Sequence, residues 1–276
     1  MAIDSGWHGR LNLIYAHHNQ ATHVAFVQGQ APLKVQRSLY PEGKDVCHSV
    51  ILHTAGGIVG GDQLSLDIQL QPQAHALITT AAAAKVYRTN GLEAIHATHV
   101  DIAPGACLEW LPQETIVFDQ AIYHQTMHVE LGTDATWLGW EITRFGRTAS
   151  GEPFIQGNWR SQTEIWQQGR PLWIDRQWLP GSEATFYGVH GLAGCPIAGS
   201  FAFVGRTVDA AIIEKARSLW TGKADKIGVT RLQSGFLCRY RGHSTTEVRR
   251  WFIEVWQLVR YSFLGRPACP SRIWGV

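Results

Sequence analysis

The segment LSLDIQLQ at residues 64–71 alternates without a break between apolar and polar side chains. Successive side chains of a β-strand point to opposite faces, so Leu64, Leu66, Ile68 and Leu70 share one face and the polar residues share the other. This period of two is typical of a strand with one buried face and one face toward water. The segment therefore predicts a sheet that packs on a core through one side.

Further segments of the same kind extend from this strand in both directions. They lie at residues 23–27, 49–53, 76–80, 95–102, 124–131, 137–143 and 157–166. Turn signals such as Pro72, Asn90-Gly91 and Pro104-Gly105 separate them at roughly the 8–12-residue spacing of all-β folds. Residues 7–180 are therefore predicted to be almost entirely β.

Helical periodicity occurs only near the end of the chain. Residues 208–219 keep one apolar face over three turns, and a second helix is predicted to begin at Ser244. Ser244 and Glu247 form a capping box, and the apolar stripe continues over residues 248–259. Residues 229–240 resemble a hairpin. The predicted fold is mainly β with two α-helices in the C-terminal part.

No linker or internal repeat interrupts the 276 residues. We therefore expect a single domain over 1–276, with a β-rich part, 1–205, and a helix-containing C-terminal part, 206–276.

Composition excludes several classes of partner and location. The formal net charge is +2 and evenly spread, which argues against binding to nucleic acid or to an anionic membrane. No apolar segment reaches the roughly 18 residues that a membrane span needs, and no signal peptide is recognisable, so a cytoplasmic protein is expected. The five cysteines are dispersed without a C-x-x-C spacing, and we interpret them as reduced, mostly buried side chains.

The glycine-rich segment GGIVGGD, residues 56–62, superficially resembles a phosphate-binding loop. It has no Lys-Ser or Lys-Thr after its last glycine, and it leads into a strand rather than a helix. A tight bend between strands is the better interpretation. The carboxylate of Asp62 at its end fits a site residue and a structural residue equally well.

Signatures of catalysis are absent from the sequence. There is no G-x-S-x-G elbow and no H-E-x-x-H, and His124 and His128, which would share one face of a strand, are better explained as exposed or satisfied side chains. Of twelve tryptophans, Trp251 and Trp256 on the last helix are candidate interface anchors, and Trp256 lies off the apolar stripe, which predicts exposure.

Four further carboxylates lie among apolar or aromatic residues, where an unpaired charge is costly. They are Glu114, Glu141, Glu152 and Asp175. Ion pairs with nearby arginines, such as Arg144, Arg147, Arg160 and Arg176, are the ordinary explanation for each of them. Several carboxylates facing one water-filled interior would instead suit passage of a divalent cation, since weak oxygen ligands exchange readily.

Five blocks of sequence, in order, resemble the UreD (UreH) family of urease accessory proteins. They are GWHGRL (6–11), LHTAGGIVGGD (52–62), TT with AKVYR (79–80, 84–88), LPQETI (111–116), and WEI with GRTASGE (140–142, 146–152). PLKVQR (32–37), YP (40–41) and DR (175–176) add to them. The blocks cover about two thirds of the chain, and the C-terminal third resembles the family loosely.

The resemblance implies stacked β-sheets resembling a β-helix in a single UreD-like domain. It also implies a non-enzymatic maturation factor that binds apo-urease with UreF and UreG and assists nickel insertion through an internal tunnel. No tightly bound cofactor is expected, only transient Ni²⁺. Carried onto this chain, the tunnel candidates are Asp62 first, followed by Glu114, Glu141, Glu152 and Asp175.

Two other classes of function stay open at the level of sequence. One is a β-rich enzyme with an unrecognised acid/base site around Asp62 and Glu141. The other is a passive β-rich interaction module with no role toward metal. The enzyme is the weakest of the three, because no nucleophile, base and orienting group occur together.

Overall fold

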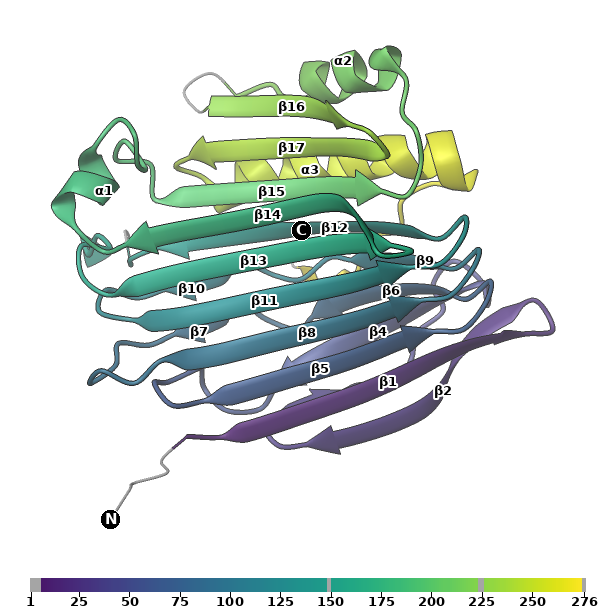
Figure 1. The fold of residues 1–276 in the computed structure, drawn as a ribbon, viewed down its shortest axis with the longest axis horizontal. Helices are drawn as coiled ribbons and strands as arrows, with labels where there is room; N and C mark the ends of the chain where they lie inside the picture. Colours follow the sequence, from purple (N-terminus) through teal and green to yellow (C-terminus); the bar gives the residue numbers. More distant parts are fainter. Residues whose placement is uncertain (1–5, 148–149, 223–225, 275–276) are drawn as a thin grey trace.

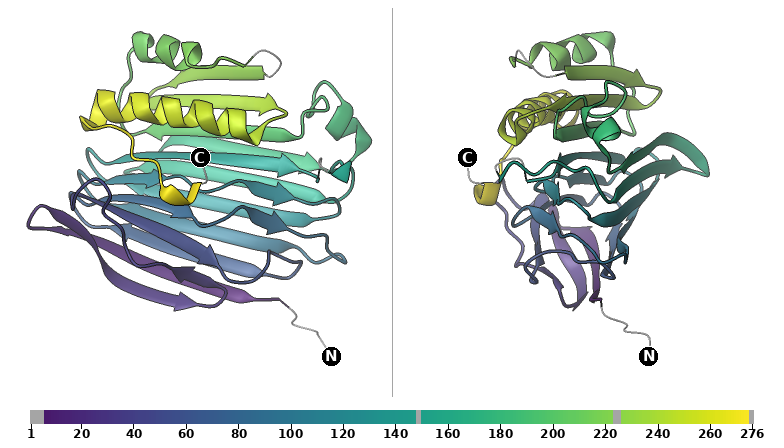
Figure 2. Two further views of the ribbon diagram at one scale, coloured as in Figure 1. Left: turned by 180° about the vertical axis from the view of Figure 1, so that it is seen from behind. Right: turned by 90° about the vertical axis from the view of Figure 1, so that its left-hand side faces the viewer.

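Two β-sheets face each other in the computed structural model, and helices cover the far side of one of them (Figure 1, Figure 2). The structure describes residues 6–147, 150–222 and 226–274. Residues 148–149, which belong to the GRTASGE block, lie outside the described residues, as do the two ends of the predicted domain, residues 1–5 and 275–276.

Sheet A is the seven-stranded sheet. Its central strands are parallel, and each of its two edge strands is antiparallel to its neighbour. Its order is β14 (Arg170–Pro180), β13 (Asn158–Gln167), β11 (Ile122–Leu131), β8 (Ala94–Ile102), β5 (Gln63–Leu70), β1 (His8–His18) and β2 (Ala21–Gln30).

Sheet B lies opposite and begins with antiparallel strands that lead into a parallel part. Its order is β16 (Lys226–Leu232), β17 (Gly235–Gly242), β15 (Ile197–Val204), β12 (Thr136–Phe145), β9 (Cys107–Trp110), β6 (His75–Thr80), β4 (Val46–His53) and β3 (Leu33–Val35). The short strands β7 (Ala84–Val86) and β10 (Thr115–Val117) pair beside β12.

From β4 to β13 the chain passes back and forth between the sheets, so that successive strands of one sheet are joined through a strand of the other. Parallel neighbours always need such a crossover, and here the second sheet provides it. Each pass stacks on the previous one, as in a β-solenoid. The predicted fold class, mainly β with stacked sheets resembling a β-helix, is confirmed.

On the inner face of sheet A, the strand register aligns apolar side chains of neighbouring strands in one row. One row consists of apolar side chains that are at most 1% exposed: Leu13, Ile68, Val100, Val129 and Ile165. The alternation of residues 64–71 is reproduced, with the four apolar side chains buried between the sheets. Burial of aligned branched side chains, worth about 1.5–3 kcal/mol each, holds the sheets together.

The helices lie largely where the sequence predicts them. The helix α2 (Ala210–Ser218) and the helix α3 (Thr245–Val259) pack on the outer face of sheet B (Figure 2). The backbone N–H of Glu247 donates to the Ser244 hydroxyl at 3.1 Å, which confirms Ser244 as the N-cap. The reciprocal bond of the capping box is not formed, because the backbone N–H of Ser244 donates to the Tyr240 hydroxyl at 3.2 Å instead. The hairpin is confirmed as β16 and β17, whereas the five-residue helix α1 (Glu183–Tyr187) is additional.

The expectation that Trp256 is exposed is wrong. Its side chain is fully buried, as is that of Trp251, and its indole N–H donates to the carboxylate of Glu109 on β9. The turn Arg272–Trp274 folds back so that the Trp274 ring lies 5.7 Å from that of Trp256. This turn covers a face of α3 that the apolar periodicity of the helix alone predicts to be exposed to solvent.

A buried ionic cluster joins the end of α3 to sheet B. The π-helical turn Arg260–Leu264 continues α3, and the Arg260 guanidinium donates to both oxygens of Glu109 at 2.7 and 3.0 Å and to both oxygens of Glu42 at 2.7 and 2.8 Å. His75 contacts Glu109 at 2.6 Å, and His48 contacts Glu42 at 2.7 Å. We refer to these five residues as the Glu109 cluster.

Candidate functional site

A cavity of about 330 Å³ lies between the two sheets. It exceeds by far the 10–15 Å³ or so that one water molecule requires, and its lining includes polar side chains, so it has room for a hydrated cation. Leu64, Leu66 and Trp137 contribute apolar walls, whereas Gly56 and Gly57 border it at the glycine-rich bend.

Polar residues occupy two neighbouring rows on the inner face of sheet A. One row continues from Leu64 through His96, Gln125, Ser161 and Gln177. The next continues from Leu66 through Thr98, Met127, Thr163 and Asp175. Apolar rows lie on either side, with Val100 and Val129 in one and Ala94 and Tyr123 in the other. Because side chains of a strand alternate, each polar residue of these rows faces the interior.

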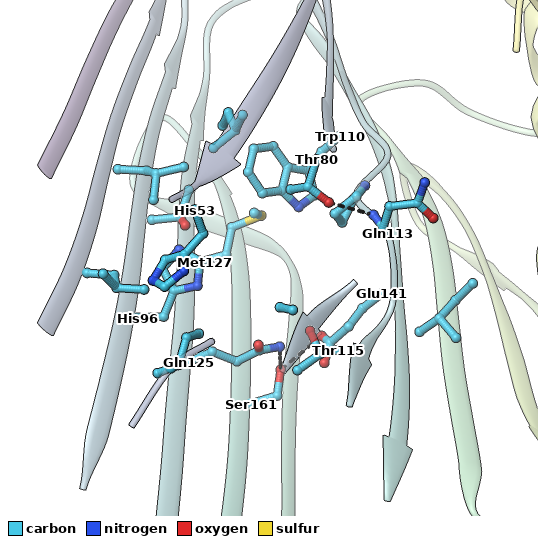
Figure 3. A pocket seen from close by; sticks show the side chains of 18 of the residues that line it. His53, Thr80, His96, Trp110, Gln113, Thr115, Gln125, Met127, Glu141 and Ser161 are labelled. Carbon is cyan, nitrogen blue, oxygen red and sulfur yellow. Dashed lines mark hydrogen bonds between the residues drawn. The ribbon is translucent and has the colours of Figure 1, made fainter. Parts of the chain in front are cut away.

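Glu141 on β12 of sheet B borders the cavity opposite these two polar rows of sheet A (Figure 3). Its two oxygens accept hydrogen bonds from the hydroxyls of Thr143 at 3.1 Å and Ser161 at 3.0 Å. Gln125 in turn donates to Ser161 at 3.0 Å. Burial raises the pKa of Glu141, and the charge of Asp175 raises it further against the opposing hydrogen bonds.

Asp175 also borders the cavity, but its charge is balanced. Both of its oxygens accept from the Arg239 guanidinium, at 2.6 and 2.9 Å, and one accepts from Gln177 at 2.8 Å. Arg239 also donates to Ser200, which pairs with Glu141 in the register of β12 and β15. Strands β12, β14, β15 and β17 thus bring the two carboxylates together through one polar network.

Asp62 lies at the glycine-rich bend rather than in the cavity lining. Its side chain is fully buried, and its two oxygens accept the backbone N–H groups of Trp7 at 2.8 Å and Val59 at 2.9 Å. The bend is close-packed, since a β-carbon on Gly60 would lie 2.0 Å from the Thr89 hydroxyl oxygen. The interpretation of residues 56–62 as a tight bend between strands is confirmed.

Glu114 and Glu152 lie away from the two polar rows of sheet A, and each of them is bound by an arginine. Glu114, whose neighbours Gln113 and Thr115 border the cavity, binds Arg249 of α3. Glu152 binds Arg147, and this hydrogen bond lowers the pKa of Glu152. The structure thus brings two of the five predicted carboxylates, Glu141 and Asp175, together, and it places the other three elsewhere.

Two cavity residues that sequence reasoning passed over are His53 on β4 and His96 on β8. The Nε2 atoms of both imidazoles are buried and have no hydrogen-bond partner among the protein residues that the structure describes. The two histidines are far apart in sequence and come from opposite sheets, so no local spacing could reveal them. His128, in contrast, lies on the outer face, where its ring stacks on that of His99 at 5.4 Å.

No three or more His, Cys, Asp or Glu side chains within residues 6–147, 150–222 and 226–274 are arranged to hold a metal ion. None of the helices in these ranges is long and apolar enough to cross a membrane. None of the five cysteines, all of which lie in these ranges, forms a disulfide bond, and Cys47, Cys107 and Cys238 are buried, as expected.

Comparison with known proteins identifies the family. Residues 8–275 match the family described as UreD urease accessory protein. A protein of Nostoc punctiforme named "Urease accessory protein UreD" is 65% identical over 274 residues, which cover 99% of this chain and 98% of the relative. Proteins of the same name from Acaryochloris marina and Synechocystis sp. are 56% and 40% identical, covering 98% and 92% of this chain and 96% and 95% of the relatives.

Fold and site together define a β-solenoid protein with a polar, carboxylate-bearing interior. The chain belongs to the UreD family of urease accessory proteins. The match includes the C-terminal third, where the sequence blocks gave only a loose resemblance.

Proposed function

We propose that this chain is a non-catalytic urease maturation factor of the cytoplasm. In this proposal it is a scaffold that binds apo-urease together with UreF and UreG, and Ni²⁺ passes through the cavity between the sheets during insertion into urease. The names of the relatives and of the family, which are those of urease accessory proteins, support the link to urease.

The observation that carries the metal part of the proposal is the position of Glu141. A buried carboxylate that receives its hydrogen bonds from two neutral hydroxyls is expensive to ionise. A divalent cation in the cavity would supply the missing positive charge and stabilise the ionised form. Burial, and then the charge of Asp175, raise the pKa of Glu141, and a cation in the cavity would oppose both effects.

The type of ligand suits transit rather than storage. Nickel stands high in the Irving–Williams order, so a closed cage of nitrogen and sulfur ligands would hold it too tightly for release. Glu141 offers carboxylate oxygens, and Asp175 could join it by exchanging Arg239 for the cation. We therefore assign the path first to these two residues.

The other three carboxylates have a weaker claim to the same path. Asp62 would have to release two backbone N–H groups, and Glu114 and Glu152 would each have to release an arginine, before binding Ni²⁺. The enzyme hypothesis also loses support, because Asp62 does not border the cavity that Glu141 faces.

The partner part of the proposal is tested by co-expression of the tagged full chain with its host's apo-urease subunits, with and without UreF and UreG. Recovery of urease with the chain, enhanced by UreF and UreG, is expected. A chain that captures neither urease nor UreF contradicts the proposal.

The metal part is tested by Glu141→Gln in the same cells. The amide preserves the size of the side chain and removes its charge, so we expect unchanged co-purification and thermal stability, with nickel content and urease activity reduced several-fold. Glu130→Gln is the matched control, since Glu130 is exposed and pairs with His128 on the outer face. Full activation by the Glu141 variant would exclude the cavity carboxylate from nickel transfer.

A further inference from the structure

His53 and His96 are the polar side chains of the cavity that the carboxylate path leaves unexplained. Both imidazoles border the cavity on the side of the glycine-rich bend, beside Met127 (Figure 3). They come from opposite walls, His53 from sheet B and His96 from sheet A. Buried nitrogen atoms normally have hydrogen-bond partners, so two unpartnered Nε2 atoms in one cavity require an explanation.

The hydrogen bond of His53 fixes its tautomer. Its Nδ1 lies 3.1 Å from the carbonyl oxygen of Ala55, which can only accept, so the proton is on Nδ1. With the proton on Nδ1, the other ring nitrogen, Nε2, is the atom that can offer a lone pair to the cavity. A metal-ligating histidine typically donates its second ring N–H to a carbonyl or carboxylate in this manner, which fixes the orientation of the ring.

His96 is equally suited to be a neutral ligand. Its Nδ1 lies 3.3 Å from the Tyr123 hydroxyl, which can accept the ring proton and leave the Nε2 lone pair free. Only the neutral imidazole coordinates a metal.

We propose that His53 and His96 form a two-imidazole station for Ni²⁺ in the cavity, from which the ion exchanges to the carboxylate of Glu141. This inference rests on the proposed function and adds nitrogen ligands to it. Between the two stations, Gln125 pairs with His96 in register and donates to Ser161, which binds Glu141. The remaining coordination positions of the ion would hold water, for which the cavity has room.

Two protein ligands are fewer than a structural metal site uses, and this agrees with the observation that the described residues contain no group of three or more ligating side chains. A site of two imidazoles and waters binds nickel weakly enough to release it. Imidazole suits nickel better than it suits Mg²⁺ or Ca²⁺, which prefer oxygen, so the station would also select for the cation.

The test uses the purified full chain without a polyhistidine tag, loaded with Ni²⁺ alone. X-ray absorption at the nickel edge is expected to show imidazole coordination in the wild type and its loss in the double variant His53→Asn, His96→Asn. Asparagine keeps a polar group near the position of Nδ1 and removes Nε2. Equilibrium dialysis should show an affinity loss of at least roughly 10–100-fold, because loss of the supporting partner of a metal-bound histidine alone costs that much and the double variant removes both imidazoles. His99→Asn, on the outer face of the same strand, is the matched control.

Urease activation in cells separates this inference from the proposed function. If the wild type binds Ni²⁺ through oxygen alone, or the double variant keeps its imidazole signal, the histidine station is refuted. If activation is lost in Glu141→Gln and unchanged in the histidine variant, the station is again refuted while the carboxylate path stands. If both variants activate urease fully, both proposals fail. Loss of the imidazole signal together with impaired activation supports the station.

Discussion

The Glu109 cluster provides the sharpest test of how the C-terminal helix is held on the sheets. In Glu109→Gln the side chain keeps its size and loses its charge, whereas Arg260, whose side chain is 0% exposed, remains buried with Glu42 as its only counterion of the cluster. Although burial alone would raise the pKa of Glu109, His75 and Arg260 lower it well below its usual range, so the carboxylate is ionised at neutral pH.

Removal of one member of a buried ion pair typically costs about 3–5 kcal/mol, because the partner is left without compensation. Glu42 still binds Arg260 through both oxygens, so we expect the lower end of that range, about 3 kcal/mol in the free energy of unfolding. With a urea slope of about 3 kcal/mol/M, the midpoint of unfolding would fall by about 1 M.

Tryptophan fluorescence is a suitable assay, since the Trp256 indole donates to the same carboxylate and reports on its surroundings. Glu130→Gln is the control, because its partner His128 and Glu130 itself are both solvent-exposed and such pairs contribute at most about 1 kcal/mol. If Glu109→Gln lowers stability by no more than this control does, the argument from buried charge is refuted.

The remaining predictions concern the bend and the pH dependence of stability. Gly60→Ala would place a β-carbon 2.0 Å from the Thr89 hydroxyl oxygen and 2.7 Å from the Leu92 carbonyl oxygen, so denaturation should show a loss of about 1–3 kcal/mol. Gly56→Ala, which meets nothing within 4 Å, should stay within about 0.5 kcal/mol, and equal losses in both variants would contradict the steric explanation. Burial opposes protonation of His75, but Cys107 and then Glu109 outweigh it and raise the pKa of His75 to about 10. A raised pKa stabilises the folded chain below the unfolded value of about 6.5, and this contribution is lost as the pH rises through 10. His75→Asn should therefore be more destabilising at pH 6 than at pH 10.5, and a difference that is constant with pH would disprove this.

Local patterns were sufficient for many of the regular elements of this protein. The alternation at residues 64–71 corresponds to the inner and outer faces of β5, and the N-cap at Ser244 begins α3 where the sequence places it. These features depend on neighbours within a few positions, so the sequence contains them directly. The glycine-rich bend was also recognisable, because the absence of a following Lys-Ser or helix excludes a phosphate loop.

Other features depend on which strands become neighbours. Strand β15 (Ile197–Val204) is buried along nearly its whole length and lacks the alternation that marks a half-exposed strand, so its apolar residues gave no period-two signal. Trp256 was expected to be exposed because it lies off the apolar stripe of α3. The expectation failed because the periodicity of one helix contains no information about Trp274, which folds over this face.

In the candidate site too, some features could be predicted from local sequence and others depend on tertiary neighbours. The sequence by itself determined that the chain is mainly β, that two helices follow, and that the carboxylates of Glu141 and Asp175, which lie among apolar and aromatic residues of the sequence, need partners. Only the tertiary structure decided that these two meet in one cavity, that Asp62 instead ties the bend to Trp7, and that His53 faces the same space as His96. The physical reason is that register across two sheets aligns residues from distant strands, and an alignment of that kind leaves no trace in the spacing of residues along the chain.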